Sequence, residues 1–385
     1  MKKYLKALAC LFIPTLLLVA CGSSGSLGNK LEMEIVSGEF VTPPDKTTRS
    51  SKDYIALELK FKNNSKDVID LFDFNVTLNT DDKSIDPTLV WDATETFKPF
   101  ADLSIDAGET KTGYLVYEVN KKVTEYTVKA RALSPTAGVD KITTEVKINT
   151  EKYEDNREEM ISIVKTYINS VFLSSDSATI SSSDSESVSF KPGKSTIVSL
   201  KTDKDKKEDK KGSSNEIGND LAEDRDDFLE AFVKNMDTLG MYYYKPSDEE
   251  KLALALKYID ENSKRAEVEC TIISYLPNVF TVSIKPKVVD LGTLDVYSLI
   301  DEYVKSKGGV SFDNYEAQQK DAEKYVFEHL PDKFSTANLS EPSYMPSEGY
   351  KLTFVKDEDQ WYIDPSDNLN YAYSEIQTAF TGGLN

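Results

Sequence analysis

The sequence has very few of the side chains on which most catalytic and metal sites depend. Its 385 residues include one histidine, three cysteines and two tryptophans. Any Ser-His-Asp or Cys-His arrangement would have to use His329, and one histidine with so few cysteines excludes an ordinary structural zinc site. The glycine pairs at 308–309 and 382–383 are isolated, so there is no glycine-rich phosphate loop. The sequence therefore predicts no catalytic centre, no metal site and no cofactor.

Basic side chains are also scarce relative to acidic ones. Lysine and arginine total 46 against 66 aspartates and glutamates, which gives a formal net charge of −20. Such an acidic surface repels phosphate backbones and anionic lipid, so the charge excludes a nucleic-acid partner. The length exceeds what one hydrophobic core usually organises, and we therefore expect two domains.

The longest apolar run lies near the N-terminus, at residues 8–20, and is too short for the ~20 residues that cross a bilayer. Lysines precede this run and small residues follow it, which is the pattern of a secretory signal. The run ends in Leu18-Val19-Ala20-Cys21, which resembles the lipobox of bacterial lipoproteins. The resemblance implies cleavage before Cys21 and a thioether-linked diacylglycerol on its sulfur.

An anchor at Cys21 would set the location of everything that follows it. Residues 1–20 would be the signal peptide, and the Gly/Ser-rich residues 21–30 a flexible tether. Two or more acyl chains hold a protein on a membrane for long periods, so we expect the remainder on the extracellular face of the cell membrane. Cys10 would leave with the signal peptide, so Cys270 would have no partner, and we expect it to be buried in a strand.

Residues 31–150 show the period-two pattern of half-buried strands. Residues 55–61 alternate apolar with polar side chains, and further strands are predicted at 68–78, 112–119, 125–133 and 142–148. Several strands without a helix predict an antiparallel β-sandwich. The turn at 105–110, followed by a Gly-aromatic-apolar strand at 113–119, resembles telokin-like immunoglobulin-fold domains of Gram-positive surface lipoproteins. That resemblance implies an immunoglobulin-like fold.

Residues 154–385 mix helical and strand patterns and predict an α+β domain. Helical spacing occurs at 154–172, 228–236, 248–258, 294–304, 315–330 and 371–380, and strands are expected at 268–275, 279–284, 350–355 and 361–363. The strand pair at 351–363, with an acidic turn before its Trp, resembles the closing hairpin of cystatin-like or nuclear-transport-factor-2-like lipoprotein domains. Residues 174–219 are rich in Ser, Asp and Lys, which predicts a disordered insertion, although 196–200 could add a strand.

Three consecutive tyrosines, Tyr242, Tyr243 and Tyr244, are the candidate ligand contacts. Their rings could stack on a sugar or a peptide, and packing at a helix end is the alternative. His329 ends a predicted helix, where it would favour the helix dipole. The acidic runs at 357–359 and 364–368 lack the ligand spacing of a calcium loop and are interpreted as solvated turns.

These patterns predict a membrane-anchored extracellular lipoprotein with a non-catalytic binding role at the cell envelope. Its partners would be the membrane, through the lipid, and an envelope protein, peptide or glycan. One alternative is a carboxylate-dependent envelope hydrolase, which needs two acids facing each other across a cleft. Another is a precursor whose signal segment, residues 13–20, is released as a signalling peptide.

The lipobox leads to a direct test of the anchor. We expect Cys21→Ala to prevent lipidation and cleavage, because no thiol remains to accept the diacylglycerol. The variant should persist as uncleaved precursor or be shed, and should no longer partition into detergent like an acylated protein. Incorporation of labelled fatty acid at the wild-type level would contradict the lipobox interpretation.

Overall fold

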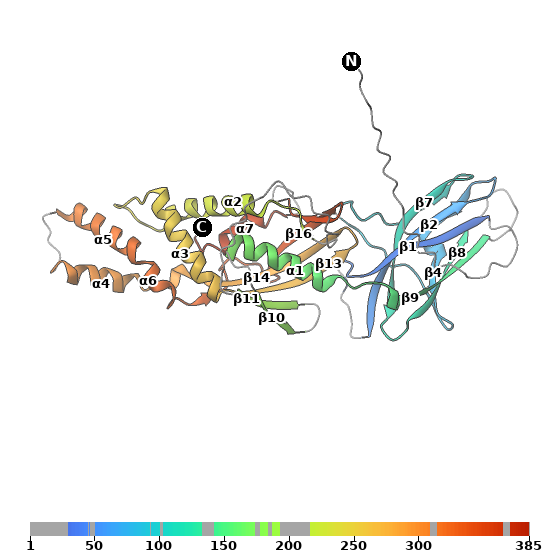
Figure 1. Cartoon of the computed structure of the whole chain (residues 1–385), viewed down its shortest axis with the longest axis horizontal. Coiled ribbons are helices and arrows are strands. Elements are labelled where there is room, and N and C mark those ends of the chain that lie inside the picture. The colour runs from blue at the N-terminus through green and yellow to red at the C-terminus, as the bar shows by residue number, and fades with distance from the viewer. Residues whose placement is uncertain are drawn as a thin grey trace, which may run out of the picture.

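The computed structural model describes residues 30–44, 46, 51–92, 94–100, 103–132, 142–173, 178–183, 187–192, 216–308, 314–364 and 370–384. Cys21 and the predicted signal peptide lie outside these residues. The molecule is elongated, with a β-rich region at one end and an α+β region at the other (Figure 1). Among the described residues, no helix has both the length and the apolar character needed to cross a membrane.

The β-rich region contains two main antiparallel sheets and a short strand pair. One sheet has the order β1-β2-β7, and the other the order β5-β4-β8-β9, while β3 pairs with β6. The strands are β1 (Leu31–Val41), β2 (Lys52–Asn63), β3 (Ile69–Leu71), β4 (Val76–Asn79), β5 (Ser84–Ile85), β6 (Leu103–Ile105), β7 (Thr110–Asn120), β8 (Glu125–Ala132) and β9 (Ile142–Asn149).

The core of this region follows from the alternation in β2. Ile55, Leu57, Leu59 and Phe61 are all buried in one cluster, as period two places them on one face. Ala56 on the opposite face is also buried, because that face meets the α+β region. The immunoglobulin-like assignment and the domain limits at 31–150 and 154–385 remain predictions.

The prediction of one strand over residues 68–78 is wrong. The chain leaves the strand at Phe72 and makes a 3₁₀ turn at Asp73–Asn75, so β3 and β4 belong to different sheets. The Asp73 side chain accepts the backbone N–H of Phe74 at 2.6 Å, a local hydrogen bond that competes with the strand ladder.

The α+β region is built on a sheet with the order β10-β11-β13-β14-β16-β17-β12, and β15 pairs with β14. Its strands are β10 (Ala178–Ser183), β11 (Ser187–Pro192), β12 (Glu216–Ile217), β13 (Glu267–Leu276), β14 (Val279–Val289), β15 (Leu339–Ser340), β16 (Tyr350–Asp357) and β17 (Gln360–Tyr362). Its helices are α1 (Arg157–Ile168), α2 (Leu221–Asn235), α3 (Asp248–Arg265), α4 (Val296–Ser306), α5 (Tyr315–His329), α6 (Pro331–Phe334) and α7 (Tyr373–Ala379), with a π-helical turn at Asn169–Leu173.

The structure corrects the predicted disorder of residues 174–219 at three places. Strands β10 and β11 form a hairpin, and β11 extends the sheet by pairing with β13 from Ser187–Thr271 to Phe190–Val268. Strand β12 pairs with β17. A segment that pairs with an existing sheet edge forms backbone hydrogen bonds whatever its side chains are. The amino-acid composition of the segment therefore did not predict these strands. Apart from residues 218–219, which follow β12, the rest of the segment, including 196–200, lies outside the described residues.

Most helices form where their sequence patterns predict, although α2 begins at Leu221 rather than at residue 228, and α3 continues to Arg265 rather than ending at residue 258. Ser247 and Glu250 form a capping box at the start of α3, where each side chain accepts the other's backbone N–H, at 3.3 and 2.8 Å. Cys270 on β13 is fully buried in the core beneath the helices, which confirms its predicted burial. Burial raises the pKa of the Cys270 thiol to about 12, so it stays protonated near neutral pH.

A buried ion cluster joins the two regions. Arg157, at the start of α1, donates to both carboxylate oxygens of Asp53 on β2, at 3.1 and 2.9 Å, and its Nε donates to Asp155 at 2.7 Å. Burial alone would lower the pKa of Arg157, but the bonds to Asp155 and Asp53 outweigh burial and raise the pKa. The guanidinium is therefore a permanent cation between two carboxylates.

Backbone and apolar contacts reinforce this junction. Thr42 and Tyr275 exchange two backbone hydrogen bonds, at 2.9 and 2.8 Å, and the Phe40 N–H donates to the carbonyl of Glu154 at 3.0 Å. A separate apolar cluster draws on both regions: Val41, Tyr54, Ala56, Val90, Phe97, Val116, Leu276 and Val279. These contacts hold the two regions in one orientation.

Removal of the buried cation should destabilise the chain strongly. We expect Arg157→Met to lower the free energy of unfolding by about 3 kcal/mol, because the buried Asp53 would lose both hydrogen bonds from the guanidinium and keep only Lys121, at 3.6 Å, as a cationic partner. Urea unfolding measures this loss. The matched control is Lys60→Met, which removes an exposed pair with Glu34 and should cost about 0–1 kcal/mol. Similar losses in both variants would contradict the role given to Arg157.

Candidate functional site

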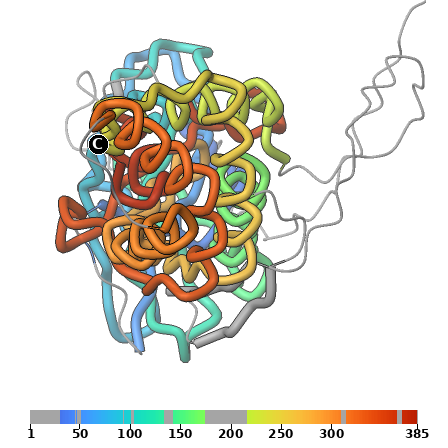
Figure 2. Tube along the Cα trace, turned by 90° about the vertical axis from the view of Figure 1, so that its left-hand side faces the viewer, coloured from blue at the N-terminus to red at the C-terminus, as the bar shows by residue number. Residues whose placement is uncertain are grey.

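A cavity of 660 Å³ lies between α4, α5 and residues 239–241, and we call it the distal groove. Helices α4 and α5 lie at the end of the molecule opposite the β-rich region (Figure 1). Seen from that end, the orange tubes of these helices are nearest to the viewer (Figure 2). The volume is within the range of pockets that hold drug-sized ligands.

The distal groove is lined by both apolar and polar side chains. On α4 the lining residues are three or four positions apart, which places them on one face of the helix. The apolar lining residues are Leu239, Met241, Val296, Ile300, Tyr303, Val304, Ala322 and Val326. The polar ones are Lys307, Gln318, Gln319, Asp321 and Glu323. This arrangement suits an apolar ligand whose orientation is set by a few polar contacts.

A single carboxylate shapes one wall of the groove. Glu323 on α5 accepts the backbone N–H groups of Tyr242 at 3.1 Å, and of Tyr243 and Tyr244 at 2.7 Å each. Hydrogen bonds to a charged acceptor are about twice as strong as neutral ones, so Glu323 holds the segment that contains Met241 against the helix. Nothing local in the sequence connects Glu323 to tyrosines about 80 positions earlier.

The structure separates the three predicted tyrosines instead of gathering them into one surface. Tyr244 is 6% exposed and packs edge-on against Phe327. Its hydroxyl donates to Glu250 at 2.7 Å, and burial together with this bond raises the pKa of Tyr244 to about 12. Tyr243 is 41% exposed and meets Tyr315 edge-on, while Tyr242 is 81% exposed. Their role as ligand contacts remains a prediction.

The lone histidine lies at the end of α5, where the sequence places it. Its Nδ1 lies 2.8 Å from the backbone oxygen of Tyr325, and its ring stacks on that of Tyr325 with centroids 3.9 Å apart. Over the part of the chain that the structure describes, no three His, Cys, Asp or Glu side chains gather to hold a metal ion. Most of the acidic run at 364–368 lies outside that part.

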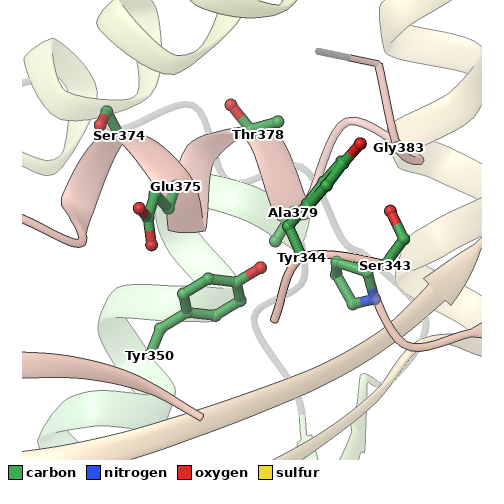
Figure 3. Close-up of a pocket in the computed structure, with 9 residues that line it drawn as sticks. Ser343, Tyr344, Tyr350, Ser374, Glu375, Thr378, Ala379 and Gly383 are labelled. Atoms are coloured by element: carbon green, nitrogen blue, oxygen red, sulfur yellow. The ribbon is translucent and has the colours of Figure 1, made fainter. Parts of the chain in front are cut away.

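A smaller pocket of 230 Å³ lies between α7 and residues 342–350. Glu375 extends from α7 toward the ring of Tyr350, and Tyr344 lies on the other side (Figure 3). Burial and the charge of Glu375 raise the pKa of Tyr350 to about 12, so the phenol is protonated near neutral pH. Glu375 is the one acid among the described residues that line this pocket, so the pocket offers no facing carboxylate pair.

Comparison with known proteins finds one family model that matches part of the chain and several solved structures of low sequence identity. Residues 30–138 match the model of a "Domain of unknown function (DUF4352)". A crystal structure of "a putative lipoprotein (ycdA)" from Bacillus subtilis is 16% identical, with a TM-score of 0.59 over 91% of this chain and 97% of that one. The yjhA protein of Bacillus subtilis is 20% identical over 31% of this chain and 93% of its own, with a TM-score of 0.24. A search of curated proteins gave no match.

The likeness to ycdA extends over both regions of the chain. At 16% identity it shows a shared fold, in which a β-rich region is followed by an α+β region.

The contacts of Glu323 predict a local loosening when its carboxylate is removed. We expect Glu323→Ala to lower the free energy of unfolding by about 1–3 kcal/mol, because three backbone N–H groups lose a charged acceptor. Hydrogen exchange at the amides of residues 242–244 should become faster, as mass spectrometry of the deuterated chain would show. Glu316→Ala, an exposed acid in the first turn of α5, is the control. An unchanged rate of hydrogen exchange at residues 242–244 would contradict the conclusion that Glu323 holds this segment in place.

Proposed function

We propose that this chain is a membrane-anchored extracellular lipoprotein that binds, without catalysis, an amphipathic peptide helix of an envelope partner. The observation that carries the proposal is the distal groove, an apolar cleft of 660 Å³ between two helices. The lipobox at Cys21 and the fold shared with a Bacillus subtilis protein described as a lipoprotein support the anchored location.

The chemistry of the groove favours a peptide helix over a glycan. A sugar needs many hydrogen-bonding partners, whereas aliphatic side chains of α4, α5 and residues 239–241 form the floor. Amphipathic helices dock in such grooves through apolar residues one turn apart. Lys307 and Asp321 have opposite charges at the edge and could set the register of the bound helix.

The position of the groove suits capture of a partner away from the membrane. The chain enters the structure in the β-rich region at β1, and α4 and α5 lie at the opposite end (Figure 1). A lipid-anchored molecule of this shape would present the groove outward. Tyr297 and Tyr315 on the same two helices are exposed, as aromatic side chains at binding surfaces often are.

No specific observation favours either alternative function. In the distal groove, Asp321 and Glu323 come from the same helix, and both oxygens of Glu323 accept backbone N–H groups. Hydrolysis by a carboxylate pair would need one carboxylate on each side of the cleft, facing the other. The signalling-peptide alternative concerns residues 13–20, which lie outside the described residues.

Site-specific photo-cross-linking on live cells tests the proposal. A photoreactive phenylalanine at position 300, in the floor of the groove, should cross-link to a partner segment with apolar residues three and four positions apart. A synthetic peptide of that segment should bind the purified chain, and Ile300→Glu should weaken binding by about tenfold or more, since a charge would enter an apolar floor.

Leu252 provides the matched control, because it is 37% exposed on α3 while Ile300 is 38% exposed. Leu252→Glu should leave peptide affinity unchanged, and the photoreactive residue at 252 should not capture the same segment. Equal loss in both variants, or cross-linking of position 300 to glycan alone, would overturn the peptide assignment. Turnover of a wall glycan or peptide by the purified chain would overturn the non-catalytic role.

A further inference from the structure

A second cavity, of 380 Å³, lies where the two regions meet, and we call it the junction cavity. Strand β1 supplies Glu39, and the segment before α1 supplies Lys152, Glu154 and Asn156. Tyr275 reaches it from the end of β13, and Lys356 from β16. Residues of both regions therefore line a cavity whose side chains are mainly polar.

The four charged side chains in the junction cavity are not paired with one another. Glu39 and Glu154 are carboxylates and Lys152 and Lys356 are ammonium groups, yet among the described residues none of them makes an ion pair within 4.0 Å. The Nζ of Lys356 instead lies 5.7 Å from the centre of the Trp361 ring. The junction cavity is thus lined by two carboxylates and two ammonium groups that form no direct ion pairs with one another.

Glu39 is the most constrained of the four. Its Oε2 accepts the hydroxyl of Tyr275 and, at 3.4 Å, the Nδ2 of Asn156, while its Oε1 accepts no hydrogen bond from a described residue. Burial raises the pKa of Glu39; the two hydrogen bonds and the charge of Lys356 act in the opposite direction, and Glu154 adds to the rise. A cation placed beside Oε1 would reduce the cost of burying this carboxylate.

We propose that the junction cavity binds a small zwitterion, an α-amino acid or a short peptide. The ligand's ammonium group would lie between Glu39 and Glu154, and its carboxylate beside Lys356 and Lys152. Tyr153, which also lines the cavity and is half-buried, offers apolar surface for the ligand's side chain. A molecule with both charges would place an opposite charge beside side chains of each sign, which a simple anion or cation would not.

This site is independent of the distal groove, and occupation would act on the junction. Glu39 belongs to the β-rich region and Lys356 to the α+β region, so one bound zwitterion would contact both. A ligand that binds only the folded chain raises its thermal unfolding midpoint. Thermal unfolding is therefore the first readout of binding.

The test uses the full chain purified in detergent, with the proteinogenic amino acids and dialanine as probes. At least one of these zwitterions should raise the unfolding midpoint. Its N-acetylated analogue lacks the cation and its amide lacks the anion, so neither analogue should do so. Calorimetric titration of the effective zwitterion then gives the dissociation constant for comparison of variants.

Two variants remove one charge of each sign from the cavity. Glu39→Gln keeps an oxygen for the Tyr275 hydroxyl, and Lys356→Met keeps an unbranched side chain that is one atom shorter. Each should weaken binding by about tenfold or more. Glu34→Gln on β1 and Lys351→Met on β16 remove charges outside the cavity and should leave the affinity unchanged. Circular dichroism confirms that each variant is folded.

Three outcomes would overturn the zwitterion site. The first is that no probe raises the unfolding midpoint. The second is that an analogue with a single charge binds as tightly as the zwitterion. The third is that the control variants weaken binding as much as the cavity variants. If one cavity variant fails to fold, the other decides the question alone.

Discussion

The contact between Arg157 and Asp53 is the constraint on which the arrangement of this molecule depends. Each region buries its own apolar cluster, but their relative orientation requires a buried cation of one region to meet a buried carboxylate of the other. A planar guanidinium that donates to both oxygens of a carboxylate permits little rotation. The adjacent bridge between Thr42 and Tyr275 limits the remaining freedom.

The junction cavity is a consequence of this rigid arrangement, whereas the distal groove belongs to the α+β region alone. The junction cavity exists because β1 and β16 approach each other without their charged side chains pairing. The distal groove lies at the far end of the α+β region, where α4 and α5 diverge beyond the sheet (Figure 1). There, Glu323 adds to the packing of Tyr244, since its carboxylate accepts three backbone hydrogen bonds from a short loop without its own secondary structure.

Local pattern predicted most of the secondary structure, and its failures have physical causes. Period two identified β2 and β7, and helical spacing identified α1 and α3, because each pattern reports one buried face. The broken strand at Asp73 was missed because a side-chain hydrogen bond ended the ladder. The hairpin of β10 and β11 was missed because pairing with β13 supplies partners that composition does not reveal.

What the sequence by itself determined is local: the burial of Cys270 and the position of His329 at a helix end, while the lipobox at Cys21 stays a prediction. Only the tertiary structure decided which distant residues meet. Glu39 reaches Tyr275 across 236 positions, Arg157 reaches Asp53 across 104, and Glu323 reaches Tyr244 across 79. Such pairs depend on how whole elements pack. The sequence contains the charges of both sites, but periodicity along one element cannot show which charge of another element will face it.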